Sequence, residues 1–103
     1  MYKIEYRSAV LRDLEEATTY LCNELQALTA ANRLLDGLDT LAQNLSEQPY
    51  MFRAYGSVLT LSDTYRIAPI DSYILFYTVD EAKQTVSFCR LFYNRRDFDN
   101  LLP

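Results

Sequence analysis

The order of apolar and polar positions along the chain predicts a strand followed by two helices. Tyr2 to Arg7 alternates apolar and charged side chains, which is typical of a strand with one buried face. From Ala9 to about Leu25, and again from Ala30 to about Leu45, apolar residues recur every three or four positions, so each segment predicts an amphipathic helix. Ser8 and Thr29 are the expected N-caps. The short link between the two segments predicts an αα-hairpin.

The second half of the chain predicts β-structure. Glu47 to Ser57 is expected to be a loop, because Pro49 disfavours helix at the residue before it. The aromatic residues of this loop predict either a cover over the core or an exposed contact surface. Four apolar segments follow and are expected to be strands, at Val58 to Leu61, Thr64 to Ala68, Ser72 to Val79 and Thr85 to Tyr93. Their short connections predict an antiparallel meander.

These elements together predict an α+β fold. An N-terminal strand leads into a two-helix hairpin, and an antiparallel three- to four-stranded meander packs on the helices, all in one domain over residues 1–103. Gly37 inside the second helix predicts close approach of a neighbouring element. Segments 72–79 and 85–93 are apolar on both faces, and the latter is expected at the centre of the sheet. Since one hairpin covers only one face, the second face is predicted to be a partner surface.

The charge balance limits what that partner is. The chain has 14 acidic and 10 basic residues, a net charge of −4, and the acidity belongs to the first half. A generally nucleic-acid-binding chain is expected to be basic, so any such contact must be local. Cys22 and Cys89 lie in apolar stretches and predict core positions. The N-terminus has no apolar leader and no stretch approaches the ~20 apolar residues that span a bilayer, so a soluble cytoplasmic protein without membrane contact is expected.

The residue types present allow only a few kinds of catalytic site. The sequence has no histidine, which excludes Ser-His-Asp and Cys-His catalysis and zinc sites built on histidine. No metal or cofactor is expected. Four arginines with tyrosines nearby remain as candidates: Arg66, Arg90, Arg95 and Arg96. Arginines can stabilise charge on a phosphate, bind the carboxylates of a partner, or form internal ion pairs, as Arg90 would with Asp71.

The later strands carry a resemblance to a known family. The segments concerned are Tyr65-Arg66-Ile67, Tyr73 to Tyr77 with Val79, Val86 to Arg90, and Tyr93-Asn94-Arg95-Arg96-Asp97. With the opening Ile4-Glu5-Tyr6 strand, the hairpin and the proline loop in the same order, the chain resembles the RelE/ParE superfamily of type II toxin–antitoxin toxins. The resemblance implies a toxin that arrests growth until a cognate antitoxin wraps it in a hetero-oligomer.

The superfamily has two actions, and the resemblance implies one of them here. RelE-like members cut messenger RNA on the ribosome, whereas ParE-like members inhibit DNA gyrase. Ala68 and Ile74 stand where RelE-like nucleases carry basic residues, Leu102 stands where several carry a tyrosine, and Tyr93 matches a histidine position. Because several of the residues that RelE-like nucleases use are missing and the net charge is negative, the resemblance favours a ParE-like toxin that binds gyrase. A ribosome-dependent endoribonuclease and a decayed, non-toxic antitoxin-binding module remain the alternatives.

Each of these hypotheses predicts its own set of site residues. A nuclease would use Arg66, Tyr93, Arg95 and Arg96 as its catalytic group. Binding of the antitoxin or the target is predicted to use a wider set on the sheet and its rim: Arg66, Tyr73, Tyr77, Arg90, Tyr93, Arg95 and Arg96. The antitoxin segment is expected to dock as a helix in a groove or as an added strand.

Overall fold

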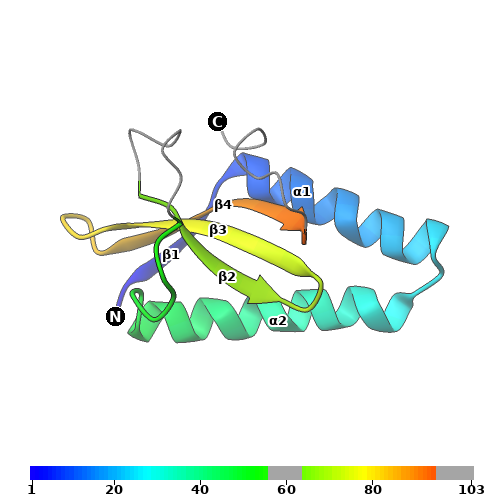
Figure 1. The fold of residues 1–103 in the computed structure, drawn as a ribbon, viewed down its shortest axis with the longest axis horizontal. Helices are drawn as coiled ribbons and strands as arrows, with labels where there is room; N and C mark the ends of the chain where they lie inside the picture. The colour runs from blue at the N-terminus through cyan, green and yellow to red at the C-terminus, as the bar shows by residue number, and fades with distance from the viewer. Residues whose placement is uncertain (56–63, 95–103) are drawn as a thin grey trace.

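A computed structural model describes residues 1–55 and 64–94 of the chain (Figure 1). The predicted strand at 58–61 and the arginines Arg95 and Arg96 lie outside the described residues. The elements run β1 (Lys3–Tyr6), α1 (Ser8–Thr19), a π-helical turn η1 (Tyr20–Glu24), α2 (Leu28–Glu47), β2 (Arg66–Ile70), β3 (Tyr73–Asp80) and β4 (Thr85–Tyr93). The predicted α+β order is therefore confirmed.

The strands form one four-stranded sheet in the order β1-β4-β3-β2. Strands β2, β3 and β4 form the predicted antiparallel meander, and β1 returns to pair in parallel with β4, from Lys3 opposite Thr85 to Tyr6 opposite Phe88. Strand β4 therefore lies inside the sheet between β1 and β3. A β-bulge interrupts the pairing of β3 with β4 next to Tyr77.

The predicted helix caps are wrong. Arg7 and Ala27 occupy the N-cap positions, and neither makes a side-chain cap hydrogen bond, while Ser8 and Thr29 lie inside the helices. Strand β1 runs directly into α1, because the Arg7 amide still donates to the Phe88 carbonyl at 3.1 Å while the Arg7 carbonyl already accepts from the first turn of the helix. At α2 the Ala27 amide donates to the Leu21 carbonyl at 2.7 Å, which fixes the turn before Leu28.

Both helices pack on the same face of the sheet. Apolar residues of α1, η1 and α2 form one core with the sheet residues that alternate toward them: Val10, Leu21, Ala31, Leu34, Leu38, Leu41, Leu45, Ala68, Ile70, Leu75, Tyr77, Val86, Phe88 and Leu91. Gly37 lies where α2 meets β2, and a Cβ on it would stand 2.7 Å from Cγ2 of Ile70. The predicted close approach at Gly37 is confirmed.

The opposite face, called the open face below, has a smaller apolar cluster. Tyr65, Phe76 and Cys89 are buried there, with Tyr55 stacked edge-on against Phe76 at 5.3 Å between ring centroids. Further apolar side chains on this face are only half-buried: Ile67, Ile74 and Phe92. No helix in the described part of the chain is long and apolar enough to cross a membrane.

Candidate functional site

Three of the predicted contact residues meet at one end of the sheet. Tyr73, Arg90 and Tyr93 line an open groove of about 620 Å³ between the α1–η1 segment and the ends of β3 and β4, called the Tyr93 groove below. Tyr73 and Tyr93 are register partners whose rings meet edge-to-face at 5.6 Å. Tyr93 is 59% exposed, and Tyr20 and Leu25 of the opposite wall are also more than half exposed. The pKa of Tyr73 is raised, mainly because the side chain is partly buried and to a lesser extent because Tyr93 and Tyr20 lie nearby.

Arg90 is held by an internal ion pair. Its Nε donates to Oδ2 of Asp13 at 2.7 Å and its second guanidinium nitrogen donates to Oδ1 at 3.1 Å, while Oδ2 also accepts the Leu91 amide at 3.0 Å. The guanidinium lies over the Phe92 ring, 4.6 Å from its centroid. The hydrogen bonds to Asp13 raise the pKa of Arg90 above its usual value.

The predicted pairing of Arg90 with Asp71 is therefore wrong. Asp71 instead accepts from Nε of Arg33 at 3.1 Å. The reason lies in the sheet, because β1 pairs with β4 only as far as Phe88 and leaves the rest of that edge to α1. Helix α1 consequently brings Asp13 beside the unpaired Leu91 amide and the Arg90 side chain.

Arg66 and Tyr77 hold the loop that follows α2. The Nη1 of Arg66 donates to the Phe52 carbonyl at 2.8 Å, and the guanidinium lies 4.8 Å from the centre of the Tyr50 ring. Tyr77 has no exposed surface, and its hydroxyl donates to the Pro49 carbonyl at 2.9 Å. The predicted contact role of Tyr77 is contradicted by this burial, since its bulk and its hydroxyl are both committed to the core.

The same loop is fastened to the β3–β4 turn through Glu81. The hydroxyl of Tyr2 donates to Glu81 Oε1 at 2.8 Å, and the hydroxyl of Tyr50 donates to Oε2. These two bonds lower the pKa of Glu81, and the bond to Glu81 raises the pKa of Tyr50 to about 12. The predicted cover over the core is confirmed for Phe52, which packs against it, while Tyr50 and Met51 are each 47% exposed and a contact role for them stays a prediction.

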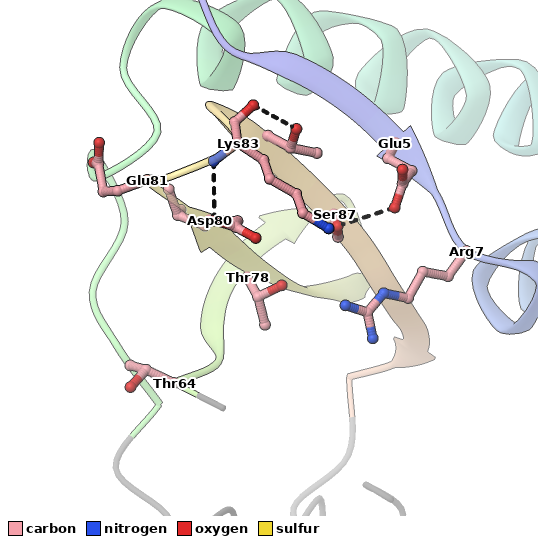
Figure 2. A pocket seen from close by; sticks show the side chains of 10 residues that line it. Glu5, Arg7, Thr64, Thr78, Asp80, Glu81, Lys83 and Ser87 are labelled. Carbon is pink, nitrogen blue, oxygen red and sulfur yellow. Dashed lines mark hydrogen bonds between the residues drawn. The ribbon is translucent and has the colours of Figure 1, made fainter. Parts of the chain in front are cut away.

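A second groove lies on the open face, over the β1, β3 and β4 strands near the β3–β4 turn (Figure 2). This polar groove has a volume of about 440 Å³ and is lined by hydroxyl and charged side chains: Glu5, Arg7, Thr64, Thr78, Asp80, Glu81, Lys83, Thr85 and Ser87, together with Val79. Sequence reasoning missed it. The local signal for this groove was the alternation of charged residues along the first strand. These residues reach the groove because β1 pairs in parallel with β4.

An apolar groove of about 450 Å³ lies at the other end of the open face, along edge strand β2. It is lined by Phe52, Arg53, Ile67, Pro69 and Ile74. The Ile67 amide donates outward to the Arg53 carbonyl at 3.3 Å, so by alternation the Pro69 nitrogen also points outward. Proline offers no amide hydrogen, which explains why β2 continues through Pro69 although a strand end was predicted before it. Strand addition at this edge is thereby disfavoured.

Comparison with known proteins fits this architecture. The family model described as the ParE toxin of the type II toxin–antitoxin system parDE matches residues 4–98, nearly the whole chain. This chain belongs to the ParE toxin family. No curated protein sequence matches it.

Solved structures of similar shape come from toxin–antitoxin complexes. The chromosomal ParDE system of P. aeruginosa has a chain with a TM-score of 0.69 and 10% identity, covering 92% of this chain and 98% of that one. The RelBE2 complex of Mycobacterium tuberculosis gives 0.57 and 19% identity, covering 90% and 98%. The archaeal RelE–RelB complex of Pyrococcus horikoshii OT3 gives 0.54 and 15%, covering 92% and 97%. At these identities the likeness establishes the shared fold.

Proposed function

We propose that this ParE-family toxin arrests growth by binding a protein target, DNA gyrase, and that a cognate antitoxin neutralises it. The similar structures are toxin–antitoxin complexes, which supports an antitoxin partner for this chain. Gyrase acts on chromosomal DNA, so we also propose that the toxin works in the cytoplasm. The single observation that carries the choice of target is the state of the arginines on the sheet.

Those arginines are committed to internal contacts. Arg90 is bonded through two nitrogens to Asp13, and Arg66 donates to the Phe52 carbonyl. Stabilisation of a phosphate in a transition state needs cations that point at the developing charge. Ala68 has no exposed surface, so the second basic position of a nuclease is filled here by a core residue. An arrangement of this kind favours contact with a protein over cleavage of RNA.

The Tyr93 groove offers the contact surface. Tyrosine and leucine side chains stand exposed on its two walls, and aromatic residues of this kind contribute most to the affinity of protein interfaces. The acid Glu16 also lines this groove. We therefore propose that the target presents an apolar side chain to the groove between Tyr20 and Tyr93.

A cellular experiment separates the two toxin actions. The toxin is expressed from an inducible promoter, and both the 5′ ends of cellular messages and the superhelicity of a reporter plasmid are measured after induction. We expect relaxed plasmid, falling colony counts and no new message ends. New 5′ ends inside translated messages, with superhelicity unchanged, would assign the RelE-like action instead. Unchanged colony counts would indicate a module that no longer acts as a toxin.

A further inference from the structure

The polar groove of Figure 2 holds three carboxylates that already have donors. Glu5 accepts from the Ser87 hydroxyl at 3.4 Å. Asp80 accepts the Lys83 backbone amide at 3.1 Å, which closes the β3–β4 turn. Glu81 accepts from the hydroxyls of Tyr2 and Tyr50. The acidic lining of the groove is therefore satisfied from within the chain.

The two cations of the groove are not satisfied in this way. Within residues 1–55 and 64–94, neither Arg7 nor Lys83 has an ion-pair partner. Figure 2 shows both side chains extending over the sheet, Arg7 from the end of β1 and Lys83 from the β3–β4 turn. The hydroxyls of Thr78 and Ser87 line the same groove, and that of Ser87 already donates to Glu5. The two cations therefore supply the donors that a small anion would need.

The backbone at both cations is fixed. The Arg7 amide donates to the Phe88 carbonyl at 3.1 Å, and its carbonyl accepts the Val10 amide at 3.1 Å. Lys83 is held in a turn closed by the bond from its own amide to Asp80 and by a bond of 3.2 Å from the Gln84 amide to the Glu81 carbonyl. An anion between Arg7 and Lys83 would thus be bound by two side chains whose backbone positions are already fixed by hydrogen bonds.

We propose that the polar groove receives one carboxylate side chain, Asp or Glu, of the cognate antitoxin, paired with Arg7 and Lys83. An arginine can bind a carboxylate through two nitrogens and a lysine adds a point charge, so the pair suits this ligand. This inference rests on the antitoxin partnership proposed above and is independent of the gyrase target.

A protein carboxylate fits the surroundings better than a nucleic-acid phosphate. The chain carries a net charge of −4, and three carboxylates line the groove beside its two cations. A polyanion would be repelled by these neighbours along its length, because nucleic-acid binding gains affinity from many basic contacts at once. A single carboxylate on a protein segment needs only the two cations as partners and does not extend along the acidic lining.

The test measures the affinity of purified full-length toxin for the antitoxin encoded beside it, using Arg7→Ala, Lys83→Ala and the double variant. Arg12→Ala on α1 is the charge-matched control, since Arg12 is exposed, unpaired among the described residues and outside the groove. Loss of a charged hydrogen bond predicts that each groove variant raises Kd about tenfold, while the control stays within about twofold. Melting temperatures are measured for all variants and are expected to be unchanged.

An acid scan of the antitoxin completes the test. Each Asp and Glu of the antitoxin is replaced in turn by Asn or Gln, and one replacement should weaken binding to wild-type toxin but not to the double variant. Groove variants that bind the antitoxin like the Arg12→Ala control would overturn the proposal. So would variants that lose affinity for a labelled RNA oligonucleotide while keeping affinity for the antitoxin. Failure of wild-type toxin to bind the antitoxin at all would contradict the partnership itself, and with it this inference.

Discussion

At the residue scale, Asp13 shows how one side chain can replace a missing strand. Its carboxylate accepts two hydrogen bonds from Arg90 and one from the Leu91 amide, at the edge of β4 that β1 does not reach. The Asp13 side chain is 11% exposed and that of Arg90 is 28% exposed, so the pair is largely desolvated. The pair of Arg33 with Asp71 is far more open, at 61% and 40%.

Replacement of Asp13 by Ala should therefore lower the free energy of unfolding by about 2 kcal/mol, because a partly buried cation and a strand amide lose their acceptor. Asp71→Ala is the matched control and should cost less than about 1 kcal/mol, as exposed ion pairs usually do. Urea denaturation of both variants measures the two values. Equal losses would show that Asp13 has no special part in closing the edge.

The hydrogen bonds that Tyr2 and Tyr50 donate to Glu81, called the Glu81 clamp below, predict that the stability of the fold depends on pH. Hydrogen bonds from Tyr50 and Tyr2 lower the pKa of Glu81 below its ordinary value of 4.5 in the folded state. A carboxylate with a depressed folded pKa contributes stability that is fully present above the unfolded pKa and is lost as the pH falls through the folded pKa. Wild type should thus melt higher than Glu81→Gln at pH 7, and the difference should shrink toward pH 3. A difference that persists unchanged at pH 3 would contradict the clamp.

At the element scale, the sequence predicts elements that depend on local periodicity and misses those that depend on distant partners. The spacing of apolar residues placed both helices and the three later strands, and Gly37 correctly indicated the crowding against Ile70. The π-helical turn at Tyr20–Glu24, the caps and the Asp13–Arg90 pair were not predicted. The Arg7 cap and the Asp13–Arg90 pair depend on where β1 and β4 meet, and no local pattern encodes that.

The contact of Gly37 with Ile70 can be tested by a double-mutant cycle. Gly37→Ala should destabilise the wild-type protein by about 1 kcal/mol or more, because the new Cβ would crowd Ile70 Cγ2. In an Ile70→Ala background the same change should stabilise by about 1 kcal/mol, since only the better helix propensity of alanine remains. Calorimetric or urea unfolding gives both values. The same sign in both backgrounds would mean that Ile70 is not the constraint.

At the scale of the whole molecule, the helices cover one face of the sheet and leave grooves at the rims of the other. That division follows from two strands that are apolar on both sides and one hairpin to cover them. The sequence could predict it without any family resemblance. Of the predicted contact residues, Tyr73, Arg90 and Tyr93 gather in one groove, whereas Arg66 and Tyr77 hold the loop after α2. Arg95 and Arg96 stay predictions, because they lie outside the described residues.

The Tyr93 groove carries a functional prediction of its own. Tyr93→Ala should weaken growth arrest about tenfold or more in the toxin dose needed, because an exposed interface tyrosine typically contributes strongly to binding. Met51→Ala is the control, as Met51 is comparably exposed but lies on the loop after α2. The readout is the inducer dose that halves colony counts, with protein levels compared by immunoblot. Equal effects of the two variants would contradict a role of the Tyr93 groove in binding the target.

The most direct measurement is supercoiling of relaxed plasmid by purified DNA gyrase in the presence of the purified toxin. Inhibition should rise with toxin concentration, should be relieved by prior addition of the cognate antitoxin, and should require more toxin when Tyr93 is replaced by Ala. Translation extracts given the same toxin should show no cleaved messages. Full gyrase activity at every toxin concentration, together with cleavage of translated messages, would contradict the account.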